Sequence, residues 1–342
     1  MSLSRFSRTS GLLVCVAFAA GCAGAPSSPA TPSVGQNAPL TTASRAHSVV
    51  GYGTSSHAAR PGGGWFSPAA RHQALLYGSS YDGGFINIYP LRGNNQTVVG
   101  QLTSGLVSPQ GMMVDRHQRL WVANTNANNI VAFKRNTTAP FKTLSDPGYY
   151  PVTVAVAPDG TVYAGNVVSL SGPPGNVAVY AHGSTTPTEL LTYSGFELVL
   201  GLGVDAKGDL FVSYVPQSGP PALVEFPKGS KVAQQMPTSD ETDGDVIFDR
   251  ADDLVMEDGQ GSLGVWPSPW GGAPTRTVPA FGNEPTFDRA ENHVWVALAN
   301  LSTPEILGYD YTTGALVDTI TNGFTPQSAI PYGVAIDPSA PR

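Results

Sequence analysis

The chain has 342 residues, of which 13% are charged, and it contains 39 Gly and 30 Pro. So many turn-forming residues, with few runs of helix-favouring residues, predict short strands joined by turns rather than a helical protein. The formal net charge of −7 argues against nucleic acid or an anionic lipid surface as the main partner, because both require basic patches.

Residues 1–21 are predicted to be an export signal. Arg5 and Arg8 precede an apolar run, residues 12–20, that is too short to span a bilayer as a helix. The run ends in Ala-Ala-Gly before Cys22, which resembles the bacterial lipoprotein signal, in which the cysteine is lipidated and becomes the new N-terminus. The resemblance implies a lipid anchor in the cell envelope, periplasmic or surface-facing, and Ala23 favours the outer membrane. A cysteine that follows small residues by chance is the alternative.

Residues 22–65 are predicted to be a disordered tether. They are rich in Pro, Ser, Thr, Ala and Gly, and such a segment cannot bury enough apolar surface to offset the entropy of ordering it. One folded domain is expected over residues 66–342. Cys15 and Cys22 are the two cysteines of the chain, so removal of the signal and acylation of Cys22 would leave the domain without a thiol or a disulfide.

From Leu75 onward the chain repeats an apolar strand, a turn, a second strand, a loop and a third strand. The turns after the first strands open 39 to 49 residues apart, at Asp115, Ala157, Asp205, Asp249, Asp288 and Asp337. This period is typical of propeller blades. An Asp in that position can accept a hydrogen bond from the backbone two residues later and close the turn.

Six units of four short strands predict an all-β fold, a six-bladed β-propeller with four-stranded blades. Residues 76–80 lack a preceding first strand, whereas residues 332–337 form a first strand with nothing after it. We therefore expect the C-terminal strand to complete the N-terminal blade and close the ring, which removes exposed strand edges. One aromatic residue per third strand is expected to pack between blades: Tyr89, Phe133, Tyr180, Phe226, Trp266 and Tyr309.

Two of the units, Pro109–Phe133 and Gly201–Tyr214, resemble NHL repeats, and the resemblance extends over residues 75–342. The whole chain is similar to exported bacterial NHL-like lipoproteins of uncharacterised type. Other propellers that look similar are enzymes, namely the gluconolactonase/senescence-marker family and the streptogramin lyases, and others bind protein, peptide or sugar. The fold by itself does not choose among these functions.

Candidate ligand-facing residues are expected where first strands begin and second strands end, around the rim of one face. They are Ser80, Gln110, Asn124, Asn166, Tyr214, Asp245, Asp258, Glu284 and Tyr332. Converging carboxylate and amide oxygens could hold Ca²⁺ or Mg²⁺, and the resemblance to lactonase-type propellers implies a comparable Glu, Asn and Asp around a divalent ion. A solvated, hydrogen-bonded rim without an ion is the favoured alternative, because every propeller has one.

No catalytic constellation is recognisable in the sequence. It has no G-x-S-x-G elbow, no His pair at helical spacing and no CxxC, so we assign no catalytic residue, metal ligand or cofactor. We expect a monomeric, membrane-tethered binding module for a protein, peptide or glycan. One alternative is a divalent-metal-dependent lactonase- or lyase-type enzyme that uses rim oxygens of Asn124, Asn166, Asp245, Asp258 and Glu284. A purely structural envelope component is the other.

Overall fold

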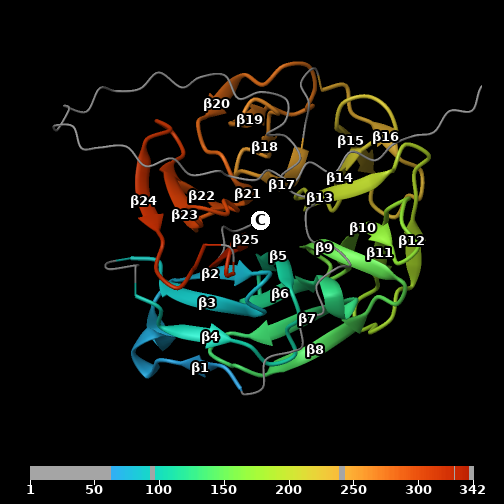
Figure 1. Cartoon of the computed structure of the whole chain (residues 1–342). Helices are drawn as coiled ribbons and strands as arrows, with labels where there is room; N and C mark the ends of the chain where they lie inside the picture. Colours follow the sequence, from blue (N-terminus) through green and yellow to red (C-terminus); the bar gives the residue numbers. More distant parts are fainter. Residues whose placement is uncertain (1–62, 93–96, 239–242, 327, 339–342) are drawn as a thin grey trace, which may run out of the picture. The chain divides into compact units, whose positions relative to one another are not determined.

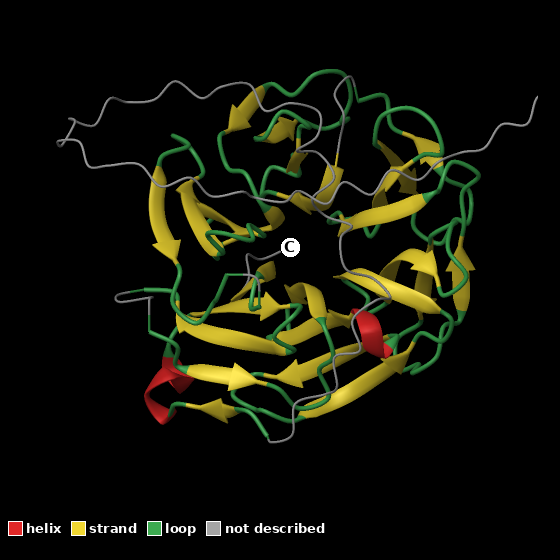
Figure 2. Cartoon of the chain, viewed as in Figure 1, coloured by secondary structure: helices red, strands yellow, loops and turns green. Residues whose placement is uncertain are grey.

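The computed structural model describes residues 63–92, 97–238, 243–326 and 328–338, all of which belong to the unit Ala43–Arg342. These residues form six antiparallel sheets arranged as a ring of blades (Figures 1 and 2). Five blades have four strands and the first has five. The predicted six-bladed β-propeller is therefore confirmed. The predicted export signal, the lipidation site Cys22 and most of the predicted tether lie outside the described residues.

The blades share one strand order, from the ring axis outward. The first strands are β25 (Pro331–Asp337), β5 (Pro109–Val114), β9 (Tyr149–Val156), β13 (Leu198–Val204), β17 (Asp243–Phe248) and β21 (Asn283–Phe287). The second strands are β2 (Leu75–Ser80), β6 (Arg119–Asn124), β10 (Val162–Ser169), β14 (Leu210–Val215), β18 (Leu254–Glu257) and β22 (His293–Leu298). The third strands are β3 (Phe85–Pro90), β7 (Asn129–Lys134), β11 (Asn176–Tyr180), β15 (Ala222–Phe226), β19 (Leu263–Trp266) and β23 (Glu305–Asp310). The fourth strands are β4 (Gly100–Leu102), β8 (Pro140–Ser145), β12 (Glu189–Leu191), β16 (Gln234–Gln235), β20 (Arg276–Val278) and β24 (Leu316–Ile320). We number the blades one to six in this order.

Blade one is completed from both ends of the described chain. The C-terminal strand β25 pairs with β2 and places Leu76 opposite Ile336, as the incomplete first and last repeats predicted. At the outer edge, β1 (Trp65–Phe66) pairs with β4 as a fifth strand. The Asp337 carboxylate at the end of β25 accepts a hydrogen bond from Arg135 of blade two, and Arg135 also donates to the Gln73 carbonyl at 2.5 Å. Arg135 of blade two thus contacts both the closing strand β25 and the segment that precedes β2.

The repeated Asp residues close the turns between first and second strands. Asp205 Oδ1 accepts backbone N–H bonds from three residues of its own turn at 2.8–2.9 Å, and Asp115 and Asp249 accept two each in the same way. In blade three, where Ala157 opens the turn, Asp159 accepts from the backbone N–H of Thr161 at 3.0 Å instead. The predicted role in the turns is confirmed for Asp115, Asp205 and Asp249, whereas Asp337 ends the last strand and accepts from Arg135 instead.

The hydrophobic core lies between neighbouring blades. One cluster joins Leu75 and Ile88 of blade one to Val122 and Phe133 of blade two, for example. The aromatic residues of the first five third strands are at most 1% exposed, and Tyr309 of blade six is partly buried against its cluster. Their predicted packing between blades is confirmed. Each such ring contributes about 2–3 kcal/mol of apolar burial.

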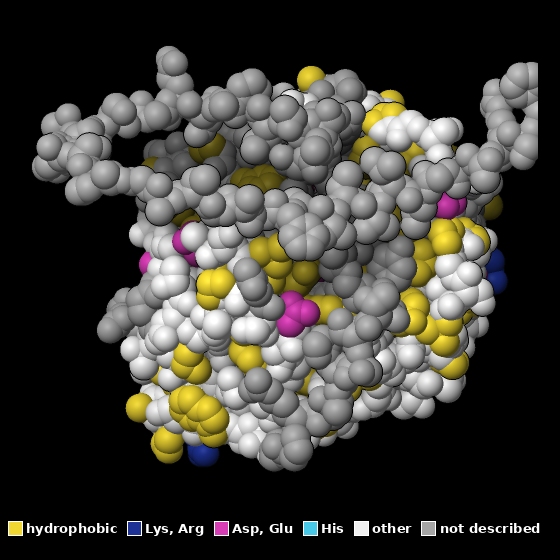
Figure 3. Space-filling view, in the orientation of Figure 1, with side chains coloured by type: hydrophobic (Ala, Val, Ile, Leu, Met, Phe, Trp, Pro, Cys, Tyr) yellow, Lys and Arg dark blue, Asp and Glu magenta, His cyan; other side chains and the backbone are white. Residues whose placement is uncertain are grey.

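Two short 3-10 helices, η2 (Pro68–His72) and η3 (Thr125–Ala127), accompany the strands. Among the described residues there is no helix with the length and apolar character needed to cross a membrane. Seen along the ring axis, the visible part of the described surface is mainly apolar or uncharged, with Lys and Arg near its edge (Figure 3).

Candidate functional site at the ring axis

The first strand of every blade loses register with the second strand near the same end. The mismatches fall between the paired residues Pro331 and Val334, Pro109 and Met112, Pro151 and Thr153, Val199 and Gly201, Asp243 and Ile247, and Asn283 and Thr286. Each mismatch leaves unpaired residues on the inner strand, which is the definition of a β-bulge. Bulges re-aim side chains and are common beside functional sites.

The bulged residues of all six blades converge on one small cavity of about 30 Å³ at the ring axis. We call these residues the bulge site: Gln110, Val152, Leu200, Gly244, Asp245, Asn283, Glu284 and Tyr332. Six of them, one per blade, lie five positions before the residue that opens the turn of their blade. A cavity of this size has room for about two water molecules, so the axis is nearly filled at this end.

The next position of the repeat, four before the turn, explains how the axis is filled. It is glycine or threonine in four blades and acidic in two: Gly333, Gly111, Thr153, Gly201, Asp245 and Glu284. A Cβ atom added to Gly111 would lie 2.2 Å from Glu284 Oε1, and one added to Gly333 would lie 2.9 Å from Glu284 Oε2. The glycines therefore leave the space that the Glu284 carboxyl occupies.

The two acidic side chains connect five blades by hydrogen bonds. Glu284 Oε2 of blade six accepts from the backbone N–H of Met112 in blade two at 2.8 Å. Asp245 Oδ1 of blade five accepts from Thr153 Oγ1 of blade three at 2.6 Å and from the Leu202 N–H of blade four at 3.1 Å. Asp245 and Glu284 are also hydrogen-bonded to each other.

The environment of this pair favours one shared proton. Burial raises the pKa of Asp245. Burial, followed by the negative charge of Asp245 and the hydrogen bond to it, raises the pKa of Glu284 well above its usual range. Two carboxyl groups in contact resist ionising together, and the larger upward shift favours the proton on Glu284, from which it can be donated to Asp245. Such a pair can exchange a proton with a ligand or replace the proton by a cation.

The backbone at Glu284 is also unusual. Its φ of 53° lies in the left-handed region, which a glutamate rarely adopts and which costs about 1–3 kcal/mol. The hydrogen bond from Met112 and the packing of the bulge hold the residue there.

The structure brings together four of the nine predicted rim residues: Gln110, Asp245, Glu284 and Tyr332. Tyr332 also packs against Tyr81, with ring centroids 5.4 Å apart. These four come from first strands, where the bulges turn them toward the axis.

The other five predicted rim residues do not line this cavity, and all of them are buried in loop or blade contacts. Ser80 Oγ accepts from the Gly83 N–H at 3.1 Å. Asn124 Oδ1 accepts from the Val107 N–H at 2.5 Å. Tyr214 packs edge-on against Tyr193.

Asn166 and Asp258 complete this group. Asn166 Nδ2 donates to Asn176 Oδ1 at 2.9 Å, and Asp258 Oδ1 accepts from the N–H groups of Gln260 and Ser262. Second-strand ends are hydrogen-bonded turns here, so the oxygens of Asn124, Asn166 and Asp258 do not join those of Asp245 and Glu284 at the axis. The described residues contain no group of three or more His, Cys, Asp or Glu that could hold a metal ion.

Sequence reasoning missed two kinds of residue. Val152, Leu200, Gly244 and Asn283 line the bulge site and could have been found from the constant spacing to the turn. Asp146, in the loop after β8, is fully buried, and burial raises its pKa to about 6 although Asn166 and Tyr180 lie close enough to lower it. Neither oxygen of its carboxylate has a hydrogen-bond partner of normal geometry. A single loop Asp carries no sequence signal of burial.

Comparison with known proteins supports the fold class. A chain in the crystal structure of a nidogen/laminin complex superimposes with a TM-score of 0.60 and 16% sequence identity, covering 77% of this chain and 98% of that chain. At this identity the likeness concerns the fold, and the protein belongs to the structural class of β-propellers. No family model and no curated protein sequence matches the chain.

Proposed function

We propose that this protein is a membrane-tethered binding module, an NHL-like propeller that recognises a protein or peptide partner on the face that contains the bulge site. The observation that carries the proposal is that the bulge site is nearly filled. Its cavity of about 30 Å³ is far below the roughly 300–1,000 Å³ of small-molecule pockets. Its two carboxyl groups are already hydrogen-bonded to the inner strands. Recognition on this face therefore falls to the surface around the axis.

The loops that surround the bulge site offer such a surface. Leu170, between β10 and β11, is 53% exposed, and Leu301, between β22 and β23, is 63% exposed. The other large exposed apolar side chains lie on the outer strands or in the turn that contains Val232. Loops held by a rigid scaffold commonly carry binding residues, and exposed apolar side chains favour a protein or peptide over a glycan. The nidogen/laminin structure, which is named as a complex, agrees with an interaction module.

The proposed location is the cell envelope, with a lipid on Cys22 and the propeller facing the periplasm or the cell surface, most simply at the outer membrane. A flexible tether of residues 22–65 would reach about 35–40 Å from the bilayer. This length separates the binding face of a monomeric propeller from the lipid surface.

The test is crosslinking of the full chain in membranes, followed by recovery of its partner. The double variant Leu170→Asp/Leu301→Asp should lose the crosslinked partner. The matched control Leu190→Asp/Val232→Asp, which changes exposed apolar residues elsewhere, should keep it. Loss of the crosslinked partner in both double variants, or in neither, would contradict the proposal that the partner binds the face that contains the bulge site. Binding to glycans without a crosslinked protein would show that the partner class is wrong.

The tether has its own test. Cys22→Ser should move the protein from the membrane fraction to the soluble fraction. Retention in the membrane fraction would contradict the lipid anchor. It would not affect the proposal about the binding face.

A further inference from the structure

A larger cavity, of about 340 Å³, lies at the opposite end of the first strands. We call it the turn pocket, because the turns β5–β6, β9–β10 and β21–β22 contribute to it, together with the ends of β13 and β25. It is lined by residues 113–119, residues 156–160, His182, Val204, Arg289 and Pro338. Its volume falls in the range of small-molecule sites.

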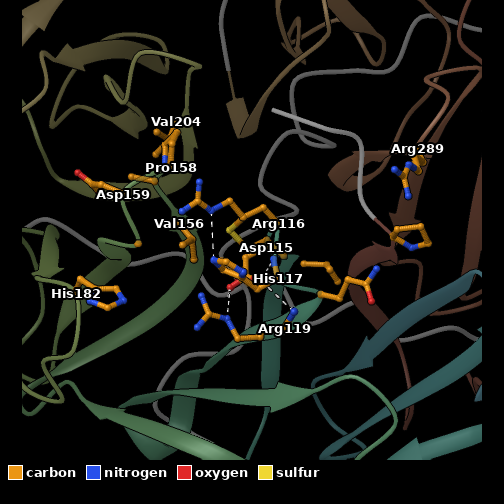
Figure 4. Close-up of a pocket in the computed structure, with 16 residues that line it drawn as sticks. Asp115, Arg116, His117, Arg119, Val156, Pro158, Asp159, His182, Val204 and Arg289 are labelled. Carbon is orange, nitrogen blue, oxygen red and sulfur yellow. Dashed lines mark hydrogen bonds and ion pairs between the residues drawn. The ribbon is translucent and has the colours of Figure 1, made fainter.

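The ionisable side chains around the turn pocket are mostly basic. Three arginines and two histidines face two carboxylates: Arg116, Arg119, Arg289, His117, His182, Asp115 and Asp159. Figure 4 shows Arg116 and His117 in the middle of this group, with His182 and Arg289 on opposite sides. This concentration of basic groups contrasts with the net charge of −7 of the whole chain.

Both carboxylates of the turn pocket have partners. Asp115 Oδ2 accepts from Arg119 Nε at 2.5 Å and from Trp121 Nε1 at 2.8 Å, while its Oδ1 closes the turn. Asp159 is 3.5 Å from the Lys228 ammonium. Asp115 therefore neutralises Arg119, and neither carboxylate neutralises another arginine of the pocket.

Arg116 and Arg289 remain available to a ligand. Neither has an ion pair with an acidic residue in the part of the chain that the structure describes. Arg116 Nε donates to His117 Nε2 at 3.3 Å, which leaves both terminal nitrogens of its guanidinium group for other acceptors. Solvated surface arginines are the ordinary alternative, but here both line one cavity of ligand size.

The other acidic turns at this end do not supply the missing carboxylates. Asp205 Oδ1 accepts three N–H bonds of its own turn. Asp249 Oδ1 accepts two backbone N–H bonds of its own turn, and its Oδ2 accepts from the Tyr311 hydroxyl at 3.0 Å. Asp288, the residue before Arg289, has its Oδ2 2.8 Å from His293 Nδ1. None of these three carboxylates forms an ion pair with Arg116 or Arg289 among the described residues.

We propose that the turn pocket binds a small ligand that carries an oxyanion, a phosphate or a carboxylate, with Arg116 and Arg289 contacting it from different sides of the cavity. The planar guanidinium group presents paired N–H donors that match the oxygens of both anions. His117 and His182 would add ring nitrogens at the same cavity. This site is separate from the proposed partner-binding face, and it takes a ligand of a different size and charge.

The test is calorimetric titration of the full mature chain in detergent with inorganic phosphate and, separately, with citrate. At least one probe should bind saturably with a Kd below about 1 mM. Arg116→Gln and Arg289→Gln should each weaken that binding at least about tenfold, the loss of about 1.4 kcal/mol. Arg92→Gln, which removes an exposed arginine that does not line the pocket, should leave it unchanged.

Resonances of the His117 and His182 rings provide an independent measurement. They should shift with the probe in the unchanged protein and stay in place in the two arginine variants. Preference for phosphate or for citrate identifies the kind of oxyanion. Absence of saturable binding with both probes, or equal weakening by Arg92→Gln, would overturn the proposal. Because the three arginines are exposed, equal melting temperatures of the variants should exclude unfolding as the cause.

Discussion

The two ends of the ring axis differ in chemistry although both are built on the first strands of the blades. At one end, the bulge site contains two carboxyl groups that are hydrogen-bonded to inner strands around a cavity of about 30 Å³. At the other end, the turn pocket encloses about 340 Å³ and is lined by exposed basic side chains. Gln110 and Asp115 belong to these two ends and are five residues apart, roughly 16 Å along a strand.

The difference shows how one repeat can produce both a closed and an open site. At the bulge site, unpaired inner-strand residues of every blade line the axis, so blades that are not neighbours in the ring share hydrogen bonds. At the turn pocket, the backbone of each contributing turn donates to an Asp of the same turn, so side chains such as Arg116 remain outside the turn's hydrogen bonds. We therefore expect changes at the bulge site to affect stability and changes at the turn pocket to affect ligand binding.

The largest effect is expected from Glu284→Ala. The change removes the acceptor of the buried Met112 N–H and the donor to the part-buried Asp245, leaving both without these partners, and it enlarges the cavity. The free energy of unfolding should fall by about 3–5 kcal/mol, measured by urea denaturation. Glu284→Gln retains an acceptor and a donor in the same places and should stay within about 1 kcal/mol of the unchanged protein. Equal losses in the two variants would contradict the shared-proton hydrogen bond.

Glycine substitutions compare the two ends directly. A Cβ at residue 111 would lie 2.5 Å from the Val152 carbonyl oxygen as well as against Glu284, and backbone cannot move aside easily. Gly111→Ala should therefore cost about 3 kcal/mol. At the turn pocket, a Cβ at residue 160 would meet the His182 ring at 2.6 Å, which can rotate, so Gly160→Ala should cost only about 1 kcal/mol for its φ of 88°. Thermal melts of the two variants measure this difference, and a larger loss at Gly160 would reverse the comparison.

The buried acid Asp146 predicts an unusual pH dependence. Its pKa is about 6 in the folded protein because of burial, above its ordinary value, so the folded state binds the proton more tightly than the unfolded chain. The protonated carboxyl therefore stabilises the folded state fully below about pH 4. The free energy of unfolding loses this contribution, about 2–3 kcal/mol, as pH rises through about 6. Asp146→Asn should match the unchanged protein near pH 4 and exceed it near pH 8, as measured by urea denaturation. An equal difference at both pH values would contradict the raised pKa.

The smallest effect is expected from divalent ions. The oxygens of Asn124, Asn166 and Asp258 do not join Asp245 and Glu284 at the axis, so Ca²⁺, Mg²⁺, Mn²⁺ and Zn²⁺ should leave the melting temperature of chelated protein unchanged. A specific site at about 100 times its Kd would add about 2.7 kcal/mol, a shift of several degrees at most. Such a shift with one ion, lost in Asp245→Asn, would return the metal-dependent enzyme to consideration.

Part of the candidate site could be predicted from the sequence because first strands have a constant register to their turns. Gln110, Asp245, Glu284 and Tyr332 follow from that register. Asn124 and Asp258 could not be placed in the same way, because the direction of a side chain at a strand end depends on local turn hydrogen bonds. The contact between Asp245 and Glu284 joins residues that no local pattern connects.

The sequence by itself determined the six-bladed ring, its closure by the C-terminal strand and the Asp-closed turns, because these depend on local patterns that recur in every blade. Only the tertiary structure decided that two carboxyl groups are hydrogen-bonded to each other at one end of the axis and that Arg116 and Arg289 line one cavity at the other. These features depend on distances between blades, and a chain shows such distances only after the ring has closed.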